Sequence, residues 1–236
     1  MRKNFSGGTF QFLQLAIGGN ITIENSNFNG VTMLFLYFSQ AKQILITNTT
    51  FENITPKTTG NYFITANTRP AQGAYLYLIQ DTTFRNFYTP YPLINLVQGN
   101  VEFSLVRVVM ENIALNPLIR RGTYQELFGE KPVGICVTGE RASLTIESSN
   151  FTNISENCLG LTATKFEIKS SIFNNSMMAE GDVLTEESYK TVKKNSGITW
   201  IASEQTPNAE VILQGNIFLE NKRLSLYGGV NSFCWF

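Results

Sequence analysis

A short repeat recurs along most of the chain and restricts its fold more than any other feature. In its clearest copy, residues 44–54, the sequence is Ile-Leu-Ile-Thr-Asn-Thr-Thr-Phe-Glu-Asn-Ile. An apolar pair comes first, then a polar turn, an aromatic residue and, two positions later, an asparagine. The aromatic position is occupied in successive copies by Phe28, Phe51, Phe84, Met110, Phe151, Phe173 and Phe218. Recurrence of this kind is typical of a solenoid in which each repeat forms one coil.

The apolar pair of each copy has the alternation of a β-strand with one buried face. The pairs are Ile21/Ile23, Ile44/Ile46, Tyr77/Ile79, Phe103/Leu105, Leu144/Ile146, Phe166/Ile168 and Val211/Leu213. A second apolar segment separates each copy from the next. One coil is therefore predicted to contain a strand, a tight polar turn, a short strand with the aromatic residue, and a third strand. Stacked coils would place the aromatic residues in an internal stack and the asparagines in a ladder of side-chain amides.

The recurring form Ile-x-Ile-x-Asn-x-x-Phe-x-Asn-Ile resembles that of right-handed parallel β-helix proteins, the pectin-lyase-like superfamily. The resemblance extends over about residues 12–230 and implies an all-β, right-handed parallel β-helix solenoid of about seven to nine coils. Residues 1–236 would form a single domain, as part of a longer chain or an assembly. A multi-stranded β-sandwich is the main alternative fold. The copies are also similar in style to long β-helix surface proteins of protists such as ciliates.

Extra residues enter several coils at one point, after the strand that holds the aromatic residue. These insertions are 55–61, 88–91, 114–132 and 177–196, and they are expected to project from one edge of the solenoid. The segment 185–197 has acids first, lysines later and Asn-Ser-Gly at its end, which predicts a short surface helix. Rings and cations on the insertions either bind a glycan or a neighbouring protein, or hold their own loops against the solenoid. This candidate binding edge comprises Tyr88, Tyr91, Arg120, Arg121, Tyr124, Tyr189 and Lys193.

The ionisable residues argue against several classes of function. Lysine plus arginine equals aspartate plus glutamate at 18 each, so nothing favours binding to nucleic acid. No apolar run is long enough to cross a bilayer, and we expect no membrane insertion. Catalytic members of the family that the chain resembles use clustered aspartates with a histidine, or acidic calcium ligands with a basic proton acceptor. This chain has no histidine, and its two aspartates, Asp81 and Asp182, lie in distant coils.

At about 4.8 Å per coil, the two aspartates would lie roughly 19 Å apart along the solenoid. Paired carboxylates that hydrolyse glycosides lie about 5–9.5 Å apart. We therefore expect a protein that is not an enzyme and that needs no cofactor or metal.

Two cysteines occupy equivalent places in adjacent copies. Cys136 and Cys158 lie at the same distance before Phe151 and Phe173, so they are expected to stack in neighbouring coils. Either a disulfide or two packed free thiols would fit that placement.

Several asparagines lie in N-glycosylation sequons, which favour a secreted or surface glycoprotein. Asn53 and Asn153 would be unavailable to a glycan if they belong to the amide ladder. The better candidates are Asn4, Asn20 and Asn174.

The two ends of the repeat region suggest a role in assembly. Solenoids need polar caps to stop end-to-end growth, and neither the Gly7-Gly8 region nor the apolar segment 233–236 supplies one. We expect an extracellular or cell-surface structural protein that acts as an assembly subunit or spacer, for example in a filament. Its partners would be other protein chains, copies of itself included. The alternatives are a carbohydrate-binding or degenerate polysaccharide-lyase-like module that uses the insertion edge, and an active polysaccharide enzyme.

Overall fold

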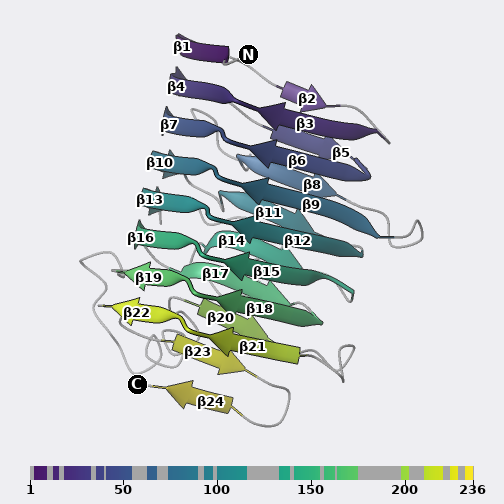
Figure 1. Cartoon of the computed structure of the whole chain (residues 1–236), viewed down its shortest axis with the longest axis vertical. Coiled ribbons are helices and arrows are strands. Elements are labelled where there is room, and N and C mark those ends of the chain that lie inside the picture. Colours follow the sequence, from purple (N-terminus) through teal and green to yellow (C-terminus); the bar gives the residue numbers. More distant parts are fainter. Residues whose placement is uncertain are drawn as a thin grey trace.

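The chain winds into stacked parallel strands that form a β-solenoid (Figure 1). The computed structural model describes residues 3–9, 13–15, 19–32, 36–39, 41–54, 63–67, 74–89, 93–97, 100–115, 133–138, 141–154, 157–162, 164–174, 198–201, 210–219, 224–227 and 232–235. Every element assigned within these ranges is a β-strand, in agreement with the predicted all-β class.

The strands form three sheets that run the length of the solenoid. Sheet A has the order β1 (Lys3–Thr9), β4 (Ser26–Thr32), β7 (Thr50–Ile54), β10 (Thr83–Thr89), β13 (Val109–Leu115), β16 (Asn150–Ile154), β19 (Ile172–Asn174) and β22 (Ile217–Leu219). Sheet B has the order β2 (Leu13–Leu15), β5 (Leu36–Ser39), β8 (Ile64–Asn67), β11 (Ile94–Val97), β14 (Val133–Thr138), β17 (Asn157–Thr162), β20 (Ile198–Ile201), β23 (Leu224–Tyr227) and β24 (Ser232–Trp235). Sheet C consists of β3 (Asn20–Glu24), β6 (Gln43–Thr47), β9 (Tyr75–Gln80), β12 (Val101–Val106), β15 (Ser143–Glu147), β18 (Lys165–Lys169) and β21 (Glu210–Gln214).

Each coil passes from sheet C to sheet A and then to sheet B, as the repeat predicts. The two strands of one sequence copy belong to different sheets: the apolar pair lies in sheet C and the aromatic residue lies in sheet A. The predicted insertions fall between a sheet A strand and the following sheet B strand, except that residues 88–89 still belong to β10 and residues 114–115 to β13. Most insertion residues, and the predicted helix at 185–197, lie outside the described residues.

The core lies between the three sheets and consists of the predicted inward positions. Ile44, Ile46 and their counterparts in the middle coils are buried. The rings at the aromatic position stack along the axis, with centroids 4.9 Å apart for Phe28 and Phe51 and 5.2 Å apart for Phe51 and Phe84. Phe63, at the corner before sheet B, packs edge-on against Phe51 at 5.1 Å. Parallel rings in register and a perpendicular ring at the corner fill the interior of the upper coils.

Both ends contain a strand that the repeat did not predict. Near the N-terminus, β1 pairs in parallel with β4 and places Phe5 opposite Phe28, so the segment Asn4-Phe-Ser is a further copy of the aromatic strand. Near the C-terminus, β24 pairs with β23 in antiparallel orientation. Sheet B therefore ends in a reversed strand, whereas the described strands of sheets A and C are all parallel.

Candidate functional site

The polar side chains of this structure are concentrated in hydrogen bonds and ion pairs between one coil and the next. Between sheets C and A the chain turns through one residue with positive φ in each coil. These residues are Asn25, Asn48, Asp81, Arg107, Ser148, Ser170 and Gly215. The N–H of this residue donates to the carbonyl that ends the sheet C strand of the next coil, as in Asn48 to Gln80 (3.1 Å) and Ser170 to Gln214 (2.9 Å).

A ladder of buried hydroxyl groups follows the same turn. The Oγ of Ser149 donates to the Glu147 carbonyl (2.9 Å) and accepts from the N–H of Val108 in the previous coil (3.0 Å). The N–H of Ser149 in turn donates to the Oγ of Ser171 in the next coil (3.1 Å). Sequence reasoning missed this ladder, although a Ser, Thr or Asn two positions before the aromatic residue marks it in most copies. The hydroxyls of Ser149 and Ser171 thus each satisfy a buried backbone donor of the previous coil.

The predicted asparagine ladder is present at the turn from sheet A to sheet B. Asn53, Asn86, Asn112 and Asn153 all have positive φ, which asparagine tolerates better than most residues. Each Nδ2 donates to the Oδ1 of the previous coil at 2.9–3.0 Å, from Asn153 through to Asn29. At the first of these turns Gly30 holds the positive φ, and Asn29 provides the acceptor. The amides therefore fix the register between five consecutive sheet A strands.

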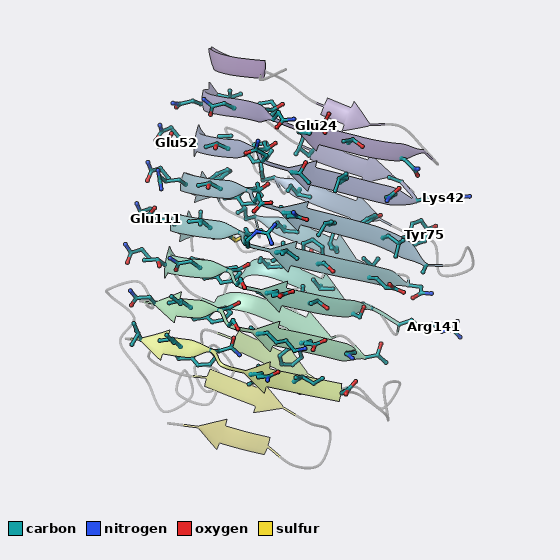
Figure 2. The ribbon with its side chains drawn as sticks, in the orientation of Figure 1. Glu24, Lys42, Glu52, Tyr75, Glu111 and Arg141 are labelled. Carbon is teal, nitrogen blue, oxygen red and sulfur yellow. The ribbon has the colours of Figure 1, made fainter. Side chains whose placement is uncertain are left out.

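Charged residues on the outer side of sheet A also stack in register from one coil to the next. Glu52, Arg85 and Glu111 lie opposite one another in successive strands, and Arg85 Nε contacts Glu111 Oε2 at 2.8 Å. Figure 2 shows Glu52 and Glu111 along this side, while Lys42 and Arg141 lie at the far margin, where the chain enters sheet C. The Arg85–Glu111 pair is partly exposed to solvent, so we assign it to register rather than to stability.

Asp81 is held by an arginine of the next coil. Arg107 donates from Nε to Oδ1 (2.6 Å) and from its terminal nitrogen to Oδ2 (2.8 Å). These hydrogen bonds, with one from Gln80, lower the pKa of Asp81 from 3.8 to about 2. A general acid for glycoside hydrolysis needs a raised pKa, so Asp81 is poorly suited to that role. Asp182, the other aspartate, lies outside the described residues.

The Asp81–Arg107 pair predicts a specific dependence of stability on pH. Because the pKa of Asp81 is lower in the folded chain than in the unfolded chain, the contribution of the pair is complete above about pH 4. It is lost as the pH falls through the folded value of about 2. Between about pH 5 and about pH 2.5, we expect the urea midpoint of unfolding to fall less in Arg107→Gln and in Asp81→Asn than in the wild-type chain. A shift as large as in the wild-type chain in both variants would contradict this assignment.

The candidate binding edge can be placed only in part. Tyr88 lies in β10, where its Cα is paired with that of Ala114 in β13. Its side chain is outside the described part of the structure. The other members, Tyr91, Arg120, Arg121, Tyr124, Tyr189 and Lys193, fall entirely outside the described residues.

The predicted stacking of the two cysteines is wrong by two positions. The register of β14 and β17 pairs Cys136 with Gly160, not with Cys158. The reason is the number of residues between the sheet B strand and the next sheet C strand, which is four in one coil (139–142) and two in the next (163–164). A two-residue offset on neighbouring strands separates the Cα atoms by roughly 8 Å. This exceeds the separation that a disulfide bridges without backbone movement.

Some sequon asparagines form side-chain hydrogen bonds between coils, and others are exposed to solvent. Asn53 and Asn153 belong to the amide ladder, and Asn48 donates to Asn25 Oδ1 at 2.7 Å. Asn20, at the start of β3, is exposed, and the candidate Asn174 in β19 is partly exposed. The third candidate, Asn4, lies in β1, but its side chain is outside the described part.

Two buried polar atoms in the described part of the chain have no hydrogen-bond partner. They are the hydroxyl of Tyr75 and Oδ1 of Asn95. Asn95 lies between Ile94 and Leu96, which are core residues, so strand alternation directs its side chain to the outer face of sheet B. No cluster of three or more His, Cys, Asp or Glu residues in metal-binding geometry occurs within the described ranges.

The last described coil exposes its apolar residues. We define the open face as the side of β21 and β22 that faces away from β18 and β19. Phe218 stacks on Phe173 at 5.2 Å, yet Phe218 is 38% exposed and Phe173 is 1% exposed. Leu213 (37%) is exposed beside it, and Ile217 (49%) and Leu219 (48%), which flank Phe218 in β22, are exposed on the outer side of sheet A. Among the described strands, β21 and β22 each pair with one neighbour only, so this face also carries unpaired strand edges.

Comparisons of the chain with protein-family models, with curated proteins and with solved structures found no match. In the described part of the structure, no helix has the length and apolar character needed to span a membrane.

Proposed function

We propose that this chain is a non-enzymatic structural solenoid that joins other protein chains through its open face. The exposed set on β21 and β22 carries the proposal. Among the residues described, Leu76 on β9 is the one other large hydrophobic side chain that is exposed. Concentration of apolar side chains on an unpaired strand edge is typical of a surface that binds another strand.

The finer features of the proposal follow from the sequence resemblance. We assign the fold to the right-handed parallel β-helix of the pectin-lyase-like kind, with about seven to nine coils in one domain. An extracellular or cell-surface location is supported by the exposed sequon at Asn20. The rod would act as an assembly subunit or spacer, with ladders that keep successive coils in register.

Native mass tests this proposal. We expect the mass of the wild-type chain, measured by sedimentation, to rise with concentration because the open face of one chain binds another copy. The double variant Ile217→Lys/Leu219→Lys should remain monomeric, because both side chains are already exposed and lysines on an edge strand oppose its pairing with another strand.

Leu76→Lys is the matched control. Leu76 is 47% exposed, about as much as Ile217 and Leu219, but it lies on the outer face of sheet C in the middle of the solenoid. This variant should associate as the wild-type chain does. A monomeric wild-type chain at all concentrations, or equal association of all three proteins, would reject assembly through the open face.

A further inference from the structure

We propose that the open face binds a parallel strand–turn–strand segment from a coil of another solenoid chain. Its two strands would pair with β21 and β22, and its aromatic ring would stack on Phe218. This inference rests on the proposed function, since it specifies the partner of the same face. Every coil-to-coil interface inside the chain is a direct precedent for the contact.

Strand alternation determines which backbone groups point to the next coil. In β9, the N–H of Tyr75 donates forward to the carbonyl of Asn100 (2.8 Å), whereas the N–H of Leu76 donates back to the carbonyl of Lys42 (3.0 Å). Inward-facing residues of sheet C therefore bond to the following coil, and outward-facing residues bond to the preceding one.

The same alternation leaves two donors of β21 directed away from the chain. The N–H of Glu210 donates back to the carbonyl of Thr164 (2.8 Å). The N–H groups of Val211 and Leu213 consequently point out of the open face, where no described residue accepts from them. An added strand would provide carbonyl acceptors for both.

The turn and β22 add three more donors. The N–H of Ile217 donates back to the carbonyl of Ser171 (2.9 Å), so the N–H of Phe218 points out of the open face. In earlier coils, the residues equivalent to Gly215 and Asn216 donate forward to a strand-end carbonyl and to a turn side chain. In the described part of the last coil, neither N–H has such a partner. A partner with a turn at the same place, and therefore with parallel strands, supplies both acceptors as the coils of this chain do.

The side chains define the chemistry of the partner further. Apolar residues at alternate positions would cover Val211 and Leu213, as Val211 and Leu213 themselves cover Phe166 and Ile168. A Ser, Thr or Asn after the turn would accept from the N–H of Asn216, and an aromatic ring would cover Phe218. The partner segment therefore has the pattern apolar-x-apolar, turn, hydroxyl or amide, x, aromatic, which is the pattern of this chain's own copies.

A peptide from the chain's own sequence can act as the probe. Residues 165–174, Lys-Phe-Glu-Ile-Lys-Ser-Ser-Ile-Phe-Asn, have the required pattern. In the proposed register their first residue would lie opposite Glu210, repeating the Lys165–Glu210 ion pair of 3.2 Å within the chain. Blocked ends would remove the terminal charges of the peptide.

Amide hydrogen exchange on the full chain, resolved by NMR with and without the peptide, tests the inference. We expect exchange at Val211, Leu213 and Phe218 to slow by about tenfold or more, while Ile212 and Ile217 remain as slow as in the free chain. The control peptide carries aspartate in place of its isoleucine at 168 and its phenylalanine at 173, and it should protect none of these amides.

The results separate this inference from the proposed function. Protection by the peptide in a chain that remains monomeric would support the strand pairing and reject self-assembly. Self-association with Val211, Leu213 and Phe218 still exchanging fast, and unprotected by the peptide, would reject the strand pairing. Equal protection by the two peptides would also reject it, because contact would then not depend on the repeat pattern.

Discussion

Replacing Phe84 by alanine is expected to destabilise the chain by about 3–5 kcal/mol, the usual cost of deleting a fully buried ring. The ring of Phe84 is fully buried and stacks on Phe51 at 5.2 Å, with Phe63 and Phe87 each 6.2 Å away. Its removal leaves a cavity between Phe51 and Met110, the residues at the same position in the two adjacent coils, which those coils cannot close without losing register. Urea denaturation followed by circular dichroism measures the loss.

Phe218→Ala provides the matched comparison at the same position of the repeat. This ring contacts Phe173 on one side and is 38% exposed, so its deletion opens no enclosed cavity. We expect a loss of about 1 kcal/mol or less from the smaller area removed from water. A similar loss of unfolding free energy in Phe84→Ala and Phe218→Ala would show that burial of the ring in the core does not determine the cost.

Replacing Asn86 by alanine is expected to cost about 2–5 kcal/mol, from two separable causes. Asn86 has a φ of 55°, a conformation that alanine adopts at a cost of about 1–2 kcal/mol. Its amide also donates to Asn53 and accepts from Asn112, both at 3.0 Å, and each bond contributes about 0.5–1.5 kcal/mol. The measurement is again the free energy of unfolding in urea.

Two further variants divide that cost. Asn86→Gly keeps the positive φ and removes only the amide, so it should lose about 1–2 kcal/mol. Asn29→Ala removes the acceptor of Asn53 at a position that has no positive φ, and it should lose about one hydrogen bond. If Asn86→Gly were as damaging as Asn86→Ala, backbone strain would have no part in the ladder.

Much of the architecture could be predicted because the same sequence pattern recurs in several copies of one repeat. The inward pair Ile44/Ile46, the stack at Phe51 and the amide at Asn53 all follow from alternation and recurrence. The hydroxyl at Ser149 was missed because a single Ser in a polar turn has many possible roles. Only the register between coils shows that its Oγ accepts from Val108.

Errors arose where the length of a turn, rather than the repeat, determines the register. The spacing from Cys136 to Phe151 equals that from Cys158 to Phe173, yet the strands pair Cys136 with Gly160. The number of residues between a cysteine and the following phenylalanine includes both strands and connecting residues. A longer connection in one coil therefore changes which residues pair in sheet B without changing the pairs in sheet A. The open face could not be assigned to particular residues from sequence either, since Val211 and Leu213 have the same pattern as their buried counterparts Phe166 and Ile168.

The side-chain amide dipoles of the asparagine ladder all point the same way along the solenoid axis. From Asn153 to Asn29, every side-chain Nδ2 donates towards the N-terminal end, so the amide dipoles add rather than cancel. The series links β16 back to β4, and the equivalent position in the last copy of the repeat is Glu220, whose carboxylate has no N–H to donate. Within these five strands the side-chain amides therefore share one direction, and a coil inserted there in the opposite direction would break the series.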